Sequence, residues 1–236
     1  MSYLGTTKIG NMYLGTTEIA KAYLGNDLVF QKGSPTPTGL VFYDRLVFDS
    51  TAHIQTDIFI PEDGVIRVTL GGETRKEAQG LFRQLGSGGS SVIAVWYGSA
   101  TTTTTRKIAC RYRTTTSSST KDASFSYTRI SLFLTPYKLG IGDSTMNITK
   151  GSTAPSQGLD IGTADATAFS GYMETIRVFG SDAKNVTSVS ELNNYTPVYT
   201  LKPCTYNGEA GLWCEETSTF YGNTAGSGTL TVANNE

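Results

Sequence analysis

Residues 169–179 read Phe169-Ser170-Gly171-Tyr172-Met173-Glu174-Thr175-Ile176-Arg177-Val178-Phe179, a stretch rich in aromatic and β-branched residues. Successive side chains of a strand point to opposite faces of its sheet. The stretch thus divides into two sets of alternate positions: Met173, Thr175, Arg177 and Phe179 against Tyr172, Glu174, Ile176 and Val178. The pattern predicts one strand over 172–179 with a buried and an exposed face.

Similar runs recur on both sides of this stretch. They cover residues 41–48, 54–60, 65–70, 81–85, 92–97, 107–112, 124–134, 138–141, 159–161 and 198–201. In 54–60 the side chains of Ile54, Ile58 and Ile60 share one side, and we expect them in the core. Only 183–192 has room for a helical turn. Many short strands without intervening helices predict an all-β sandwich or barrel.

The charge pattern excludes an electrostatic nucleic-acid interface. The formal net charge is −1, and phosphate binding needs clustered Lys and Arg. The local basic cluster is Arg106, Lys107, Arg111 and Arg113. It alternates with apolar residues, which predicts a solvated strand face. The sequence shows no secretory signal and no apolar run of membrane-spanning length, so we expect synthesis in a cytoplasm and no membrane insertion.

The cysteines, Cys110, Cys204 and Cys214, are odd in number and form no Cys-x-x-Cys motif. We expect three reduced, packed thiols. The alternative is a bridge between Cys204 and Cys214 across a hairpin, which requires an oxidising environment.

The first 33 residues contain an internal repeat with a spacing of ten residues. Its copies are Tyr3-Leu4-Gly5, Tyr13-Leu14-Gly15 and Tyr23-Leu24-Gly25. Three residues after the Gly, each copy continues with a pair that ends in an aliphatic residue: Lys8-Ile9, Glu18-Ile19 and Leu28-Val29. Each unit therefore predicts a strand, a Gly turn and a strand. Units with two or three apolar side chains cannot stabilise themselves. We therefore expect residues 1–33 to attach to other chains; the alternative is a meander packed on the following domain.

Composition shifts set the expected boundaries. Gly33-Ser34-Pro35-Thr36-Pro37-Thr38-Gly39 contains two prolines, which predicts a semi-rigid linker over 34–39. Residues 40–202 hold the predicted sandwich. Residues 203–236 are expected to form a β-hairpin segment that completes or decorates it. The expected organisation is therefore a short β-repeat attachment module, a linker and a displayed β-sandwich.

Two segments resemble the closing strands of concanavalin A-like lectin/glucanase domains, including the laminin G-like group. They are Leu159-Asp160-Ile161-Gly162-Thr163 and the stretch over 169–179, and residues 127–134 with 137–140 resemble the preceding strands. The resemblance covers about residues 39–202. It implies a jelly-roll sandwich of two antiparallel sheets.

Both ends of the chain resemble phage proteins. The segment from Pro203 to Leu230 is similar to tails of fibre and adhesin-like proteins from phages of gut Bacteroidales, and the Tyr-Leu-Gly units resemble the start of proteins from those phages, including the crAss-like group. The resemblance implies a virion structural protein made in the host bacterial cytoplasm. It also implies other virion proteins as partners of residues 1–33 and a homotrimer, as in fibres.

An enzyme is the weaker interpretation. A retaining glycosidase needs two carboxylates about 5 Å apart on one face. The adjacent pairs Glu62-Asp63 and Glu215-Glu216 do not fit, and His53 is the single histidine. The laminin G-like resemblance allows calcium in loops, but Asp143, Asp160 and Asp165 match no ligand spacing, so we expect no cofactor. The chain is therefore predicted to be non-enzymatic, with a glycoside hydrolase as the third-ranked function.

Carbohydrate binding is the remaining activity. Exposed aromatic rings stack on sugars, and the candidates for such stacking are Trp96, Tyr97 and Trp213. Side chains of this kind more often belong to the core. If these rings do stack on sugars, the ligand of a displayed sandwich is a host-surface polysaccharide. A stand-alone carbohydrate-binding module is the second-ranked function.

Overall fold

A computed structural model describes the strands within residues 3–31 and residues 37–72, 79–100, 105–115, 119–124, 129–142, 144–163 and 168–235. The chain divides into two compact units, Met1–Thr38 and Gly39–Glu236. Within the described part, the larger unit is built from strands and two short 3-10 helices. No helix among the described residues is long and apolar enough to cross a membrane.

The N-terminal unit consists of β-hairpins, one for each sequence repeat. The described strands are β1 (Tyr3–Leu4) with β2 (Thr7–Lys8), β3 (Met12–Leu14) with β4 (Thr17–Ile19), and β5 (Lys21–Leu24) with β6 (Asp27–Gln31). The two strands predicted for each repeat are therefore confirmed. The pairing of Leu4 with Thr7, of Leu14 with Thr17 and of Leu24 with Asp27 leaves two residues between the strands of each hairpin. Gly5, Gly15 and Gly25 lie outside the described residues.

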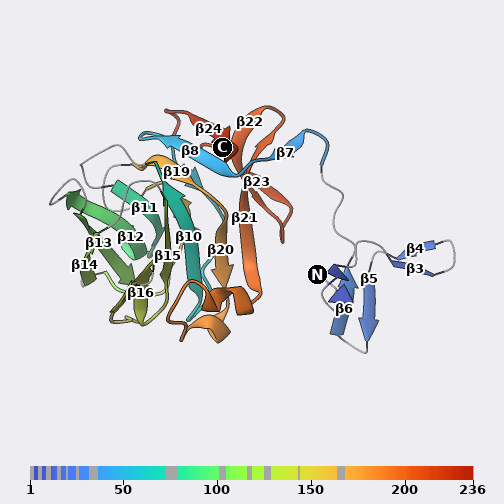
Figure 1. The fold of residues 1–236 in the computed structure, drawn as a ribbon, viewed down its shortest axis with the longest axis horizontal. Coiled ribbons are helices and arrows are strands. Elements are labelled where there is room, and N and C mark those ends of the chain that lie inside the picture. Colours follow the sequence, from blue (N-terminus) through green and yellow to red (C-terminus); the bar gives the residue numbers. More distant parts are fainter. Residues whose placement is uncertain are drawn as a thin grey trace. The chain divides into compact units, whose positions relative to one another are not determined.

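The larger unit contains a sheet that the described residues form from twelve strands (Figure 1). Eight of them run in the order β17 (Ser144–Asn147), β16 (Lys138–Ile141), β15 (Ile130–Leu134), β10 (Val65–Gly71), β20 (Ile176–Phe179), β21 (Pro197–Tyr206), β22 (Glu209–Cys214) and β23 (Thr219–Tyr221). The other four are β7 (Leu40–Phe42), β8 (Arg45–Asp49), β19 (Ser170–Met173) and β24 (Leu230–Ala233). Strands β22, β23 and β24 of the C-terminal segment thus belong to this large sheet.

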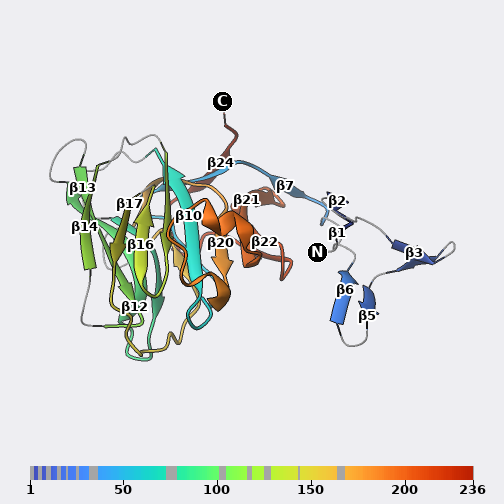
Figure 2. The same ribbon diagram turned by 60° about the horizontal axis from the view of Figure 1, so that its bottom comes forward.

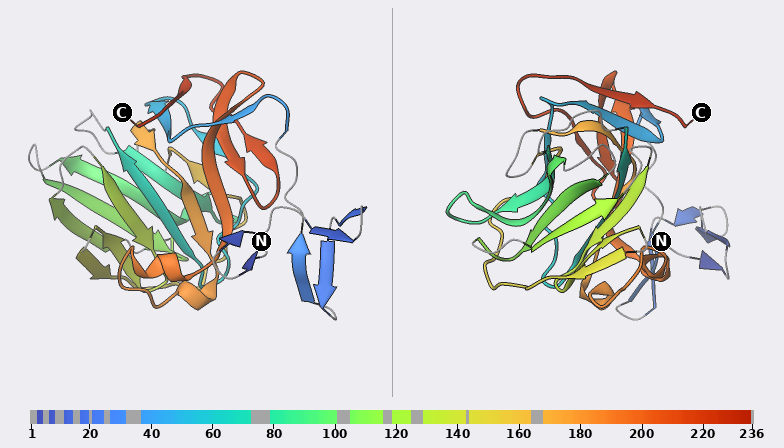
Figure 3. Two further views of the ribbon diagram at one scale, coloured as in Figure 1. Left: turned by 45° about the vertical axis from the view of Figure 1, so that its right-hand side comes forward. Right: turned by 60° about the vertical axis from the view of Figure 1, so that its left-hand side comes forward.

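A second sheet of the larger unit has six described strands (Figure 3). Their order is β14 (Ser119–Ser124), β13 (Thr105–Tyr112), β12 (Ser91–Ala100), β11 (Gln79–Leu85), β18 (Asp160–Ile161) and β9 (Ile54–Gln55). All strand pairings in both sheets are antiparallel. The predicted all-β class is therefore confirmed.

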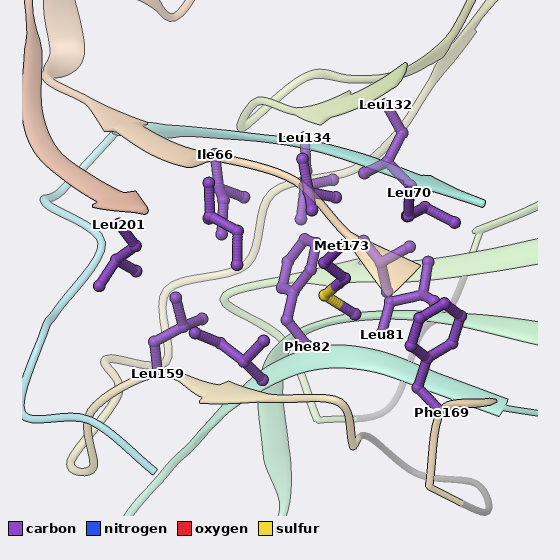
Figure 4. Close-up of a cluster of buried hydrophobic side chains, with 14 of the residues drawn as sticks. Ile66, Leu70, Leu81, Phe82, Leu132, Leu134, Leu159, Phe169, Met173 and Leu201 are labelled. Atoms are coloured by element: carbon purple, nitrogen blue, oxygen red, sulfur yellow. The ribbon is translucent and has the colours of Figure 1, made fainter. Parts of the chain in front are cut away.

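The two sheets share one hydrophobic core, to which each contributes rows of cross-strand neighbours. One row of the small sheet is Ile54, Ile161, Phe82, Val95 and Cys110, and one row of the large sheet is Leu139, Leu134, Ile66 and Val178. Figure 4 shows side chains from both sheets, among them Phe82 and Leu134, pointing into the space between the ribbons. The unit is therefore a β-sandwich.

The strand predicted over 172–179 is interrupted at Glu174 and Thr175. Leu70 pairs with Met173 and Arg67 pairs with Arg177, so three residue steps on β10 face four on β19 and β20. The extra residue is a β-bulge, which shifts the alternation by one position. Met173, Ile176 and Val178 consequently all face the core. The prediction of one uninterrupted strand is wrong, and Arg177 lies on the face opposite to Met173.

Two other predicted strands differ from the observed elements. The run 41–48 is divided at Tyr43 and Asp44, because β7 pairs with β21 while β8 pairs with β19 and β24. In 54–60 only Ile54–Gln55 pairs as a strand. Ile54, Ile58 and Ile60 are nevertheless 0–2% exposed, so their expected burial is confirmed.

A helical segment covers part of the outer face of the large sheet (Figure 2). It contains the 3-10 helices η1 (Ser181–Ala183) and η2 (Glu191–Asn194), close to the turn expected over 183–192. Ala183, Val186 and Leu192 pack there on Val65, Phe133 and Phe179. This second apolar cluster fixes the segment against β10, β15 and β20.

The cysteines are buried free thiols. In the ladder of β21 and β22, Cys204 pairs with Gly211 and Cys214 pairs with Leu201. Positions 201 and 204 are an odd number of residues apart, so the two thiols lie on opposite faces of the sheet. The alternative of a Cys204–Cys214 bridge is therefore wrong, and the expectation of packed thiols is confirmed.

Candidate functional site

Two of the three aromatic residues proposed for sugar stacking are buried. Tyr97 is 0% exposed and faces the sandwich core, and Trp213 is 8% exposed in a cluster with Leu40 and Cys204. Trp96 points to the outer face of the small sheet and is half-buried. The guanidinium carbon of Arg111 lies 5.3 Å from the centre of its ring. Because Tyr97 and Trp213 are buried, neither ring offers a face to a sugar. One face of the Trp96 ring is already covered by the Arg111 guanidinium.

The outer face of the small sheet also carries an ion pair. The register places Gln55, Asp160, Arg83, Ala94 and Arg111 in one cross-strand row. Arg83 Nε donates to Asp160 Oδ2 at 3.0 Å, and Asp160 is 4% exposed. A buried carboxylate held by a neighbouring guanidinium is a structural contact.

The carboxylates considered for catalysis bind nearby groups. Lys150 donates to Asp63 Oδ1, and this hydrogen bond is the largest influence that lowers the pKa of Asp63. Glu215 accepts from Lys202 Nζ at 2.7 Å, and Glu216 accepts from the Thr200 amide at 2.6 Å. These acids cap or cross-link strands. Their arrangement supplies no acid–base pair for glycoside hydrolysis.

The loops considered for calcium give no ligand set in the described part of the chain. Asp143 and Asp165 lie outside it, and Asp160 pairs with Arg83. Within the described residues no group of three His, Cys, Asp or Glu side chains is close enough to hold a metal ion.

The outer face of the large sheet places arginines side by side. One cross-strand row there contains Gly140, Phe133, Arg67, Arg177 and Thr200 (strands β16, β15, β10, β20 and β21 in Figure 1). Arg67 and Arg177 are direct partners in the ladder of β10 and β20, and both are half-buried. Arg67 Nη1 donates to Asn193 Oδ1 at 3.0 Å, which links the row to η2.

A third arginine of this face is already paired. Arg129 Nε and Nη2 donate to the two carboxylate oxygens of Glu174 at 2.7 and 2.8 Å. This hydrogen bond raises the pKa of Arg129. Burial is the main influence that lowers the pKa of Arg67, the charges of Arg177 and Arg129 lower it further, and the charge of Glu174 acts in the opposite direction as the smallest of the four influences. The surroundings of Arg67 and Arg177 are therefore electropositive.

A pocket of about 240 Å³ opens beside Arg177. It is lined by Arg177, Phe179, Leu192, Asn193, Tyr195 and Pro197. Phe179 and Leu192 belong to the second apolar cluster, so the pocket walls are fixed by packing between η2 and β20. The pocket combines a cation, an amide and apolar walls, which is a composition suited to a small polar ligand.

Sequence reasoning missed Arg67 and Arg177. They are 110 positions apart, and only the register of β10 against β20 brings them together. The basic residues that the sequence grouped behave differently: Arg113 is 8% exposed, and the side chains of Arg106 and Lys107 lie outside the described residues. The available signal was an arginine inside each of two strongly apolar runs, since a charge there marks the outer face.

No protein-family model matches the chain, and no curated protein matches it. Among solved structures it is similar to the enzymatically active domain of tailspike protein 2 of bacteriophage CBA120, at 10% sequence identity and a TM-score of 0.43. The match covers 65% of this chain and 30% of that one. A likeness of this degree supports no conclusion about activity or partners.

Proposed function

We propose that this chain is a non-enzymatic structural protein of a bacteriophage virion, a fibre, decoration or adhesin subunit. Residues 1–33 attach it to other virion chains, in a homotrimer, and the sandwich is displayed toward the host surface. The proposal also assigns the sandwich to the concanavalin A-like group. The carboxylates of Asp63, Glu215 and Glu216 are each bound to a neighbouring group, which favours this function over a hydrolase.

The observation that carries the proposal is the pairing within the N-terminal unit. Its described strands form separate two-stranded sheets, none of which shares a ladder with another of the described hairpins of this unit. An isolated two-stranded hairpin is at best marginally stable in water. The sandwich, in contrast, has its own core and can fold alone. Surfaces supplied by other chains would stabilise the hairpins, and this supports an attachment role.

Deletion of residues 1–38 tests the attachment role. We expect the truncated chain to unfold cooperatively like the intact one but to be missing from purified particles, when tagged versions of both are produced in infected cells and quantified by mass spectrometry. A second variant is the full-length chain with Tyr3, Tyr13 and Tyr23 replaced by alanine. It keeps the chain length and should also be missing from the particles. Incorporation of the truncated chain at the intact level would refute the attachment role.

A stand-alone carbohydrate-binding module is the second candidate, favoured by the pocket beside Arg177. It predicts that glycan binding survives the deletion and that neither version enters particles. Analytical ultracentrifugation measures the oligomeric state of the intact and the truncated chain. If the virion proposal holds, the intact chain is a trimer and the truncated chain is a monomer.

A further inference from the structure

Arg67 and Arg177 form a like-charge pair, and neither side chain has a carboxylate in ion-pair contact in the described part of the chain. Their side chains project from directly opposed positions of an antiparallel ladder, where like charges destabilise a sheet. The charge of Glu174 acts on Arg67, but both oxygens of this carboxylate are held by Arg129. Neither Arg67 nor Arg177 makes an ion pair with any described carboxylate.

A purely structural role does not account for this pair. The Arg67 side chain has the neutral amide oxygen of Asn193 as its hydrogen-bond acceptor, and the Arg177 side chain makes no hydrogen bond to a described residue. Half-burial of both side chains removes part of the water that would otherwise screen their repulsion. An oxyanion placed between two guanidinium groups would offset the repulsion, because each group can donate two parallel N–H bonds.

The pocket next to Arg177 indicates a ligand larger than an inorganic ion. Its volume of about 240 Å³ exceeds the volume of a single small anion, and Phe179, Leu192, Tyr195 and Pro197 give it apolar walls. An inorganic ion gains nothing from contact with apolar walls, whereas the C–H groups of a sugar ring pack against them. Asn193 lines the same space and can bond a hydroxyl group.

We propose that Arg67 and Arg177 bind the oxyanion of an acidic sugar residue whose ring lies in the pocket formed by β20 and η2. The ligand is thus a unit of an anionic polysaccharide, carrying a carboxylate or a sulfate. This assignment deepens the proposed function, on which the choice of a sugar rests. Arg129 and Glu174 keep their mutual pair and shape the edge of the site.

Isothermal titration calorimetry on the full chain tests the site with defined probes. Tetragalacturonate carries carboxylates, a heparin tetrasaccharide carries sulfates as well, and maltotetraose is the neutral control. We expect an acidic probe to bind and maltotetraose to show no binding, and the comparison of the two acidic probes identifies the oxyanion. No binding of either acidic probe, or equal binding of maltotetraose, would overturn the proposal.

Variants localise the binding. Arg177→Gln and Arg67→Gln should each lower the affinity for the acidic probe by about tenfold or more, because hydrogen bonds to charged groups are among the strongest. Lys202→Gln is the matched control: it removes one positive charge from the same face of the large sheet, but that charge is already paired with Glu215. Equal weakening by Lys202→Gln would mean that net charge alone attracts the probe, which overturns the site.

Thermal unfolding of the same variants separates binding from structure. Arg177→Gln removes the like-charge repulsion, so the unliganded variant should unfold at the same temperature as the native chain or higher. A loss of stability that parallels the loss of binding would contradict the proposal. Because binding is measured without particles, its failure leaves the attachment role untouched, and a failed deletion experiment likewise leaves the site intact.

Discussion

Gly140 is the position where a single methyl group should have the largest effect on the arginine face. It lies directly opposite Phe133 in the ladder of β15 and β16, and the Phe133 ring covers it. A Cβ atom at position 140 would lie 2.0, 2.3 and 2.6 Å from three atoms of that ring. Carbon atoms in contact are normally about 3.5–4.0 Å apart, so the ring would have to move by roughly 1.5 Å.

The magnitude follows from what holds Phe133 in place. The ring is 0% exposed and packs with Val65, Phe179 and Leu192. A rigid ring in a packed cluster cannot relax freely, and overpacking of this kind costs about 1–3 kcal/mol. For a unit of this size each kcal/mol corresponds to roughly 2–4 °C in Tm. Gly140→Ala is therefore expected to lower the free energy of unfolding by about 1–3 kcal/mol.

Urea denaturation followed by tryptophan fluorescence measures this change. The matched control is Gly88→Ala, because a Cβ at Gly88 meets no heavy atom within 4 Å and its φ is not in the left-handed region. The control should be neutral or more stable by about 0.4–1 kcal/mol. Phe133→Leu in the Gly140→Ala background should cost less than the sum of the two single changes. If Gly140→Ala and Gly88→Ala unfold at the same midpoint, the packing argument is refuted.

Further predictions concern the core, the thiols and one carboxylate. Phe82→Ala should destabilise the sandwich by about 3–5 kcal/mol in the same urea assay, because the ring is 2% exposed in the shared core. Burial raises the pKa of Cys110 and of Cys204 to about 12, so Ellman's reagent should label these thiols only after unfolding; rapid labelling of the native chain would contradict their packing. Hydrogen bonds from Thr51 and other donors, acting against desolvation, lower the pKa of Asp49 to about 2. Its contribution to stability should therefore be present above pH 3.8 and be lost as the pH falls toward 2, and Asp49→Asn should remove that part of the pH dependence of Tm; an unchanged profile would count against it.

The sequence predicts the fold class well because side-chain alternation is a local property. Ile54, Ile58 and Ile60 are buried as expected even though the backbone beyond Gln55 leaves the ladder. The bulge at Glu174 and Thr175 could not be predicted, since neither residue is a Gly and the shift shows only in the pairing with β10.

The candidate site was less predictable than the fold. The aromatic residues singled out for stacking are large and apolar, and the same property that suits them to sugars buries Tyr97 and Trp213. Arg67 and Arg177 are neighbours only through strand register across 110 positions, and no local pattern encodes register. The repeat, in contrast, was visible at once because each hairpin closes within its own ten residues.

The first strands of the sandwich pair with its last ones. β7 lies against β21, and β8 lies against β24, whose residues Leu230–Ala233 are about 185 positions further along the chain. A ribosome must therefore release almost the whole unit before these ladders can close. Such long-range pairing slows folding and leaves the edges of β7 and β8 open on the nascent chain. Premature termination even shortly before Leu230 would yield a sandwich in which β8 keeps only β19 as a partner and presents an open edge, a species that aggregates or is degraded.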